Sequence, residues 1–219
     1  MQNIKILLTA AGCPGASTLI RMLKNNGERK IEIVGVDMNP YAIGKFMCDK
    51  FYTVPAAKEE DKYISKIKEI MMIEKPDILF PQSSAEVHPI SKHKNEFEAM
   101  GAKVLVAGSY EIEVCNDKAM TYRTLEGSGV PLPVTYYPKN MDEFIEYSEL
   151  LGYPEKDICF KPNISKGSRG FRIISSKINR AHLILNERPN NLYITMKDFI
   201  DIFKDEEFPS IMLMEYVAG

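Results

Sequence analysis

The segment Asn163–Gly170 has the composition that a polyphosphate site requires. Its chemical groups are two glycines, two serine hydroxyls and two cations, namely Gly167, Gly170, Ser165, Ser168, Lys166 and Arg169. The glycines permit backbone conformations and a close approach that other residues cannot reach. The hydroxyls and free amides can donate hydrogen bonds, and the cations supply positive charge. Such a short pattern also fits an ordinary polar hairpin loop. The phosphate hypothesis therefore needs support from residues outside the loop.

Two lysines outside the loop can supply this support. Lys161 precedes the loop on a predicted strand and faces away from Ile158 and Phe160, because side chains alternate along a strand. Lys118 opens a predicted helix that runs through Leu125. Alone, either lysine is typical of a solvated surface. We therefore predict that both ammonium groups contact a single triphosphate, and that the glycine loop closes over it as a flap.

The elements that position these residues fall into two parts. In the first part β-branched runs alternate with helix-length segments, which indicates a parallel sheet with crossover helices. The expected strands are 5–9, 31–37, 51–54, 77–81 and 103–107, and the expected helices are 16–26, 61–74 and 86–100. This is an α/β, doubly wound pattern, whose ligand crevice lies beyond the carboxyl ends of the strands.

The second part begins near Tyr110, where the order changes to helix, strand, helix and hairpin. We place the domain boundary between residues 112 and 113. Two capping pairs, Asn140 with Glu143 and Thr195 with Asp198, predict the starts of two helices. The expected strands are 134–137, 158–161, 171–173 and 211–217.

A second glycine pattern imitates a dinucleotide fingerprint. Gly12 and Gly15 follow the first strand and Asp37 ends the second, but Ala10 stands where the first glycine is needed. A tight turn in a doubly wound domain explains this pattern better than nicotinamide binding. An NAD(P)-dependent oxidoreductase or epimerase remains the alternative in another enzyme class.

Composition limits the partners and the compartment. The 219 residues include 28 Lys and Arg against 30 Asp and Glu, which gives no field that would gather a nucleic acid. No apolar run approaches the roughly eighteen residues of a membrane span, so no membrane partner is expected. Four scattered cysteines and three histidines lack metal-ligand spacing. We expect a protein of the reducing cytoplasm.

Four stretches together carry a family likeness, and they cover nearly the whole chain. They are Lys5-Ile6-Leu7-Leu8-Thr9 with Gly12 and Pro14-Gly15; Cys115-Asn116-Asp117-Lys118 with Gly129-Val130-Pro131; Phe160-Lys161-Pro162 with Gly167-Ser168-Arg169-Gly170; and Met214-Glu215-Tyr216. In the order and spacing of these stretches, the sequence resembles the ATP-grasp superfamily, most closely the ATP-binding half of the carbamoyl phosphate synthase large chain and its stand-alone relatives. The resemblance implies a Rossmann-like pre-ATP-grasp domain, followed by the lid and hinge of an incomplete ATP-grasp domain.

The resemblance also implies roles for individual residues. Lys118 would approach the phosphates, Lys161 the adenine ring and α-phosphate, and the Gly167–Gly170 loop the β- and γ-phosphates. Backbone groups of the hinge would bind the adenine edge; its residues are Glu215, Tyr216 and Val217. A substrate would lie near Gly12, Gly15 and Glu86, although Ser83-Ser84 departs from the Thr and Asp that relatives tend to have before that Glu.

The implied reaction is transfer of the ATP γ-phosphoryl group to a carboxylate or carbonate oxygen, followed by attack of an amine on the acyl phosphate. The partners would then be small carboxylates and amines, with ATP and Mg²⁺ as cofactors. In the family the metal ligands and the catalytic arginine follow the hinge strand, so we expect them beyond Gly219. Residues 1–219 alone are expected to bind nucleotide weakly without turnover. A second chain that completes the fold, a homo-oligomer, and a non-catalytic nucleotide-binding or assembly module all remain open.

Overall fold

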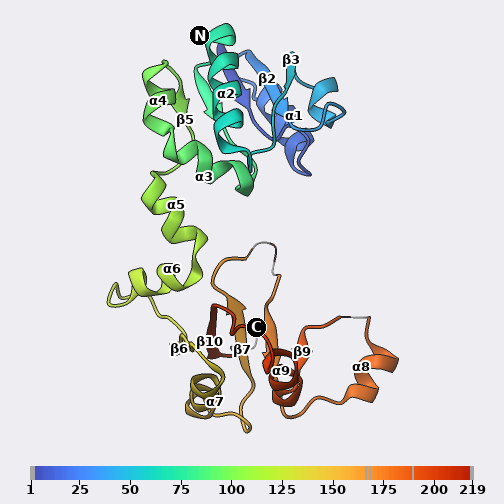
Figure 1. Cartoon of the computed structure of the whole chain (residues 1–219). Coiled ribbons are helices and arrows are strands. Elements are labelled where there is room, and N and C mark those ends of the chain that lie inside the picture. Colours follow the sequence, from blue (N-terminus) through green and yellow to red (C-terminus); the bar gives the residue numbers. More distant parts are fainter. Residues whose placement is uncertain (1–2, 166, 168, 189, 218–219) are drawn as a thin grey trace. The chain divides into compact units, whose positions relative to one another are not determined.

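A computed structural model describes residues 3–165, 167, 169–188 and 190–217. The chain divides into two compact units, Met1–Glu113 and Val114–Gly219, which we call unit 1 and unit 2. Both units contain helices and strands (Figure 1). The division lies next to the boundary expected from the sequence.

Unit 1 is built on a five-stranded parallel sheet with the strand order β3-β2-β1-β4-β5. The strands are β1 (Ile4–Leu8), β2 (Ile31–Asp37), β3 (Lys50–Thr53), β4 (Ile78–Phe80) and β5 (Lys103–Val104). The helices are α1 (Ala16–Lys24), α2 (Glu60–Glu74), α3 (Ser84–Lys92) and α4 (Lys94–Ala99), with a 3₁₀ turn η1 at Ile43–Phe46. Parallel strands require crossovers, so helices cover both faces of the sheet, as the sequence predicts.

The core of unit 1 follows the alternation of side chains along β1. Leu7 lies in the cluster that contains Tyr63 of α2 and Phe97 of α4, whereas Ile6 packs on the other face with Ile20 of α1. All five are almost completely buried. Burial of each side chain of this size contributes about 1.5–3 kcal/mol, which fixes the sheet between its two helical layers.

The single helix expected over residues 86–100 is wrong, because the structure has two helices there. α3 ends before His93, whose φ of −101° and ψ of 13° lie outside regular helix geometry, and α4 begins at Lys94. Pro89 lies inside α3 and has no N–H to donate to the carbonyl of Ala85. The sequence pattern also missed α5 (Ser109–Asn116) and α8 (Arg180–Asn186).

Unit 2 contains a mixed sheet with the order β6-β10-β7-β8-β9. Its strands are β6 (Thr135–Tyr136), β7 (Ile158–Pro162), β8 (Arg172–Ile174), β9 (Tyr193–Ile194) and β10 (Ile211–Glu215). The central strand β7 is antiparallel to both β10 and β8, and β8 is parallel to β9. Helix α6 (Lys118–Leu125) precedes the sheet, α7 (Met141–Leu150) precedes β7, and α9 (Met196–Phe203) precedes β10.

One face of this sheet packs on α7 and α9 through aromatic side chains. The Phe144 ring stacks on Phe199 with centroids 4.0 Å apart, and Phe160 of β7 meets Phe199 edge-on at 5.2 Å. The predicted caps start both helices: the Asn140 side chain accepts the Glu143 N–H, and Thr195 forms a capping box with its partner three residues later. Both capping predictions are confirmed.

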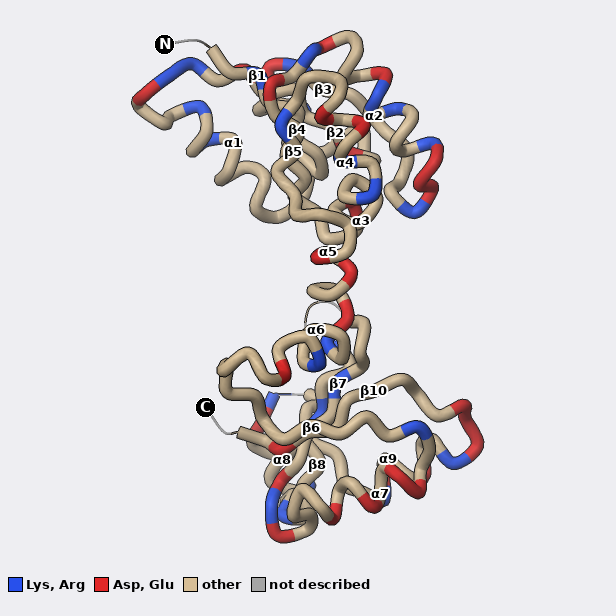
Figure 2. Tube along the Cα trace, turned by 90° about the vertical axis from the view of Figure 1, so that its left-hand side faces the viewer, with Lys and Arg blue, Asp and Glu red and all other residues tan. Residues whose placement is uncertain are grey.

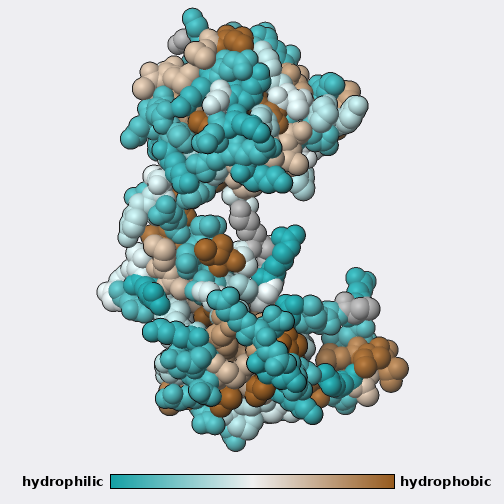
Figure 3. Space-filling view, in the orientation of Figure 1, coloured by the Kyte–Doolittle hydropathy of each residue, from teal (hydrophilic) through white to brown (hydrophobic). Residues whose placement is uncertain are grey.

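The surfaces of the two units agree with the balanced composition. Basic and acidic residues are interspersed on both (Figure 2). Exposed apolar side chains gather over α8, where Ile184 and Leu185 are each 79% exposed (Figure 3). Across the described part of the chain, we find no helix with the length and apolar character needed to cross a membrane.

Candidate functional site

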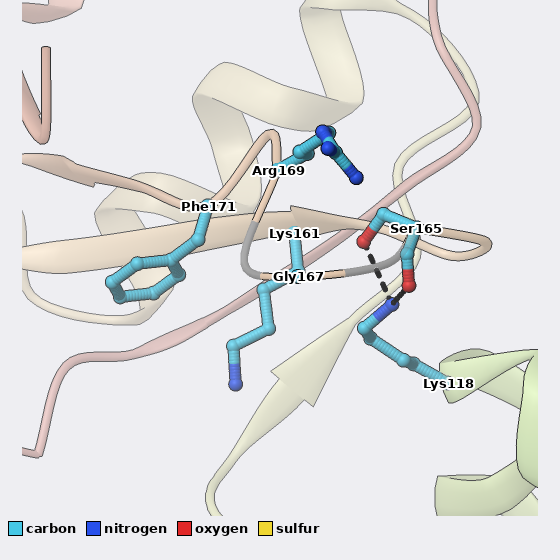
Figure 4. A pocket seen from close by; sticks show the side chains of 6 residues that line it. All are labelled: Lys118, Lys161, Ser165, Gly167, Arg169 and Phe171. Atoms are coloured by element: carbon cyan, nitrogen blue, oxygen red, sulfur yellow. Dashed lines mark hydrogen bonds between the residues drawn. The ribbon is translucent and has the colours of Figure 1, made fainter. Parts of the chain in front are cut away.

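A pocket of about 470 Å³ in unit 2 brings the two predicted lysines and the glycine loop together. Its lining residues are Lys118, Lys161, Ser165, Gly167, Arg169 and Phe171 (Figure 4). Lys166 and Ser168, also predicted for this site, lie outside the described residues. Gly170 ends the loop at a positive φ of 79°, and a Cβ there would come within 2.4 Å of Pro162. The conformation of this loop therefore requires glycine at that position.

Lys118 is held at the pocket by both its backbone and its side chain. It is the first residue of α6, whose N-cap Asp117 accepts hydrogen bonds from the next two backbone amides. The Lys118 backbone N–H donates to the Asn163 carbonyl at 2.9 Å. Its Nζ donates to Ser165 Oγ at 2.8 Å and to the Ser165 carbonyl at 3.1 Å (Figure 4). It also donates to the Pro162 carbonyl at 3.4 Å. These bonds join the start of α6 to the start of the loop.

Lys161 reaches the same pocket from β7. Its neighbour Phe160 belongs to the aromatic core under α7 and α9, so the alternation predicted from the sequence holds. The Lys161 Nζ lies 5.6 Å from the centroid of the Phe171 ring, a cation–π contact. Sequence reasoning treated Phe171 as an ordinary strand residue, whereas the pairing of Phe160 with Arg172 across β7 and β8 places it on the face of Lys161.

The electrostatics of the pocket favour an anion. Burial lowers the pKa of Lys118 below its usual range, and the positive charge of Lys161 lowers it further, while Asp117 opposes the shift. Two ammonium groups that repel each other both gain from a shared anion. With Arg169, three cations line the pocket, and none of its described lining residues is a carboxylate.

These residues do not fit Mg²⁺, which takes oxygen ligands and is bound through carboxylates. Over the described ranges, no group of three or more His, Cys, Asp or Glu side chains is arranged to hold a metal ion. The described residues of this pocket therefore suit the phosphate groups of a nucleotide and not a metal ion.

The predicted hinge lies at the end of β10. The Glu215 N–H donates to the Val134 carbonyl at 3.2 Å, and its own carbonyl faces the Cys159 Sγ at 3.7 Å. Burial raises the pKa of Cys159 to about 11, so this thiol stays protonated near neutral pH. Tyr216 packs on the apolar cluster that also receives the Phe171 ring, and Val217 is exposed.

The cluster beneath Tyr216 consists of Cys159, Ile173 and Met214, on the sheet face opposite α7 and α9. None of the three described hinge residues, 215–217, is among the residues that line the pocket. The hinge and the pocket are connected through this apolar face, which is the kind of surface on which an aromatic base can lie.

The predicted substrate residues lie in unit 1, beside a separate pocket of about 270 Å³. Gly12 and Glu86 line it together with Asp37, at the carboxyl ends of the strands, whereas Gly15 is not among its described lining residues. The Glu86 Oε2 accepts a hydrogen bond from the Thr9 hydroxyl at 2.6 Å. Burial raises the pKa of Glu86 above its usual range despite this bond.

The imitation of a dinucleotide fingerprint has a local structural cause. The Gly12 N–H donates to Asp37 Oδ2 at 2.7 Å, and the Asn39 N–H donates to Oδ1 at 2.8 Å. A Cβ on Gly12 would lie 2.7 Å from the Ala42 Cβ. Asp37 thus holds the turns after β1 and β2, and close packing excludes a side chain at Gly12.

Comparisons with known proteins agree with this arrangement. Residues 6–105 match the family described as PylC-like, N-terminal domain. The chain is 26% identical over 156 residues to the carbamoyl phosphate synthase large chain of Agathobacter rectalis, which covers 68% of this chain and 14% of that protein. These matches support the predicted resemblance to the ATP-grasp superfamily.

Solved ATP-grasp structures share the fold of both units. One is N5-carboxyaminoimidazole synthetase from Staphylococcus aureus complexed with ADP, at 14% identity and a TM-score of 0.64; the match covers 98% of this chain and 47% of that one. Another is the biotin carboxylase domain of 2-oxoglutarate carboxylase from Hydrogenobacter thermophilus with MgADP, at 20% identity and a TM-score of 0.65, covering 99% and 45%.

The chain thus spans under half the length of these solved structures and 14% of the curated relative. The parallel sheet of unit 1 corresponds to the pre-ATP-grasp domain, and the mixed sheet of unit 2 matches the first half of ATP-grasp enzymes. The predicted fold class and family resemblance are both confirmed.

Proposed function

We propose that this chain is the ATP-binding portion of an ATP-dependent carboxylate–amine ligase of the carbamoyl phosphate synthase large-chain type. The observation that carries the proposal is the convergence of Lys118, Lys161 and Arg169 with the glycine loop on one pocket. Three cations beside an apolar, aromatic surface suit a ligand that has several phosphates and a base. A nucleoside triphosphate has both parts.

In this proposal the chain binds and orients the nucleotide rather than forming bonds to it. Phosphoryl transfer depends mainly on positioning and on neutralising charge, and the two ammonium groups face the same space, where they can do both. The Phe171 ring and the apolar face beneath Tyr216 would receive the base. The γ-phosphoryl group would pass to a carboxylate or carbonate oxygen with release of ADP, and an amine would then displace phosphate from the acyl phosphate.

The acceptor substrate is proposed to lie beside Gly12 and Glu86 in unit 1. The pocket there occupies the carboxyl ends of β1 and β2, where doubly wound sheets bind their ligands. Its volume of about 270 Å³ suits a small molecule. The buried Glu86 carboxyl group is the polar group that would orient such a substrate.

The proposal is tested by calorimetric titration of the purified chain with ADP and ATP. Lys161→Met should weaken binding of either nucleotide about tenfold or more, because a charge-assisted contact with phosphate is lost. The control is Lys204→Met, which removes an exposed lysine of the same unit that lies outside the pocket. NADH should not bind. Absence of nucleotide binding, or equal losses in the two variants, would contradict the proposal.

A further inference from the structure

The Lys118 ammonium group has three N–H donors, and three acceptors surround it. They are Ser165 Oγ at 2.8 Å, the Ser165 carbonyl at 3.1 Å and the Pro162 carbonyl at 3.4 Å. A lysine has no further donor with which to bind a phosphate oxygen. A ligand that bonds to this nitrogen must therefore take the place of one of these acceptors.

The three contacts differ in strength, and their order identifies the one that a ligand would replace. The contact with Pro162 is the longest and lies at the outer limit for an N–H···O hydrogen bond, so it is the weakest. Ser165 supplies both shorter contacts, from two oxygens of one residue. Replacement of the Pro162 carbonyl would leave the ammonium group held by Ser165, with its third donor directed at the ligand.

Lys118 needs such support because its surroundings disfavour its charge. It is partly buried, and Lys161 adds a second positive charge to the same pocket. Oxygen atoms that accept hydrogen bonds from the charged ammonium group offset both its burial and the repulsion from Lys161. Ser165 is the residue that supplies most of them.

We propose that Ser165 is a positioning residue, which holds the Lys118 ammonium group through its carbonyl and hydroxyl oxygens while a phosphate oxygen replaces the Pro162 carbonyl. This inference rests on the proposed nucleotide site and adds to it. It differs from the role expected from the sequence, in which the Ser165 hydroxyl itself donates to phosphate. In our inference the contribution of Ser165 passes through Lys118.

A double-mutant cycle separates these two roles. Ser165→Ala should weaken ADP binding by residues 1–219 about tenfold, since it removes one hydrogen bond to a charged group. In a Lys118→Met background the same change should alter affinity less than twofold, because the group that Ser165 positions is gone. Ser165→Thr keeps the hydroxyl and should restore most of the affinity. An equal loss in both backgrounds would overturn the inference and favour a direct bond to phosphate.

A second measurement needs no ligand, so it separates failure of the inference from failure of the proposed function. Lysine-labelled chain is titrated with pH, and the Lys118 side-chain signal is followed by NMR. Ser165→Ala should lower the pKa of Lys118 further, because the charged form loses an acceptor. The control Ser176→Ala removes a hydroxyl that donates to the Pro154 carbonyl of the same unit at 2.7 Å, and should leave Lys118 unchanged. An unshifted Lys118 in Ser165→Ala would overturn the positioning role, even if ADP binds.

Discussion

The buried carboxylate of Glu74 in α2 accepts hydrogen bonds from side chains of two strands, β1 and β3, so its neutralisation should weaken unit 1. Its side chain is 2% exposed. It accepts hydrogen bonds from Lys50 Nζ at 2.7 and 2.9 Å, from the Tyr52 hydroxyl at 2.6 Å and from Lys5 Nζ at 3.3 Å. The substitution Glu74→Gln keeps the shape and removes the charge that attracts both lysines.

The expected magnitude follows from the exposure of the partners. Hydrogen bonds to charged groups contribute about 1.5–3 kcal/mol each when buried. The side chains of Lys5 and Lys50 are 25% and 50% exposed. Water can therefore replace part of the hydrogen bonding that each ammonium group loses with the Glu74 carboxylate. We therefore expect Glu74→Gln to lower the free energy of unfolding of unit 1 by about 3 kcal/mol at pH 7, which corresponds to a fall in Tm of roughly 10 °C or more.

The loss of unfolding free energy caused by Glu74→Gln should be smaller in acid than at neutral pH. Burial by itself raises the pKa of Glu74, but the hydrogen bonds from Lys50, Tyr52 and Lys5 outweigh it and hold the pKa below its usual range. A lowered carboxyl pKa stabilises the folded state fully above the unfolded value, and this contribution disappears as pH falls through the folded value. The gap between wild type and Glu74→Gln should be constant near neutral pH and shrink below about pH 4.5.

Unfolding of unit 1 can be followed by the urea dependence of Cys48 alkylation, read by mass spectrometry. Burial raises the pKa of this thiol to about 11, so it should react slowly until the unit opens. The control is Glu69→Gln, the same substitution on the exposed side of α2, where only an i,i+3 pair with Lys66 is lost. That change should cost less than about 0.5 kcal/mol. Equal effects of the two substitutions, or a gap that widens in acid, would refute the reasoning.

Three further outcomes are expected in unit 2. Phe144→Ala, at a fully buried ring in the aromatic core, should lower the free energy of unfolding of this unit by about 3–5 kcal/mol, measured by urea titration. Lys161→Met should raise the pKa of Lys118, because it removes a neighbouring positive charge; NMR titration of the labelled side chain measures this, and a fall would contradict it. Gly170→Ala should destabilise the loop by about 1–3 kcal/mol and weaken ADP binding, since the new Cβ would meet Pro162; an unchanged melting temperature and affinity would show that the backbone adapts.

Much of this architecture could be predicted because its determinants are local. The alternation of side chains along β7 placed Lys161 opposite Phe160, and the short-range capping signals of Asn140 and Thr195 located the starts of α7 and α9. The break at His93 was missed, because Pro89 within a helix-length pattern does not by itself say where the helix ends.

The finer arrangement of the pocket depends on contacts between distant residues, which leave little trace in the sequence. Lys118 meets Ser165 across 47 positions of the chain, and two of its three acceptors are backbone carbonyls that any residue could supply. The sequence alone identifies Phe171 only as an apolar residue of a strand. Its contact with Lys161 requires the pairing of β7 with β8, which brings the two strands side by side.

Adjacent positions of β7 serve different environments, since Phe160 enters the aromatic core and Lys161 enters the pocket. Substitutions on the pocket side of this strand can therefore accumulate without disturbing the packing on the other side, so ligand preference can diverge while the scaffold persists. A one-residue insertion near the start of the strand would do the opposite, because it would turn Lys161 toward the aromatic core and Phe160 away from it. Divergence among such chains should thus proceed by replacement at alternate positions and spare the length of the strand.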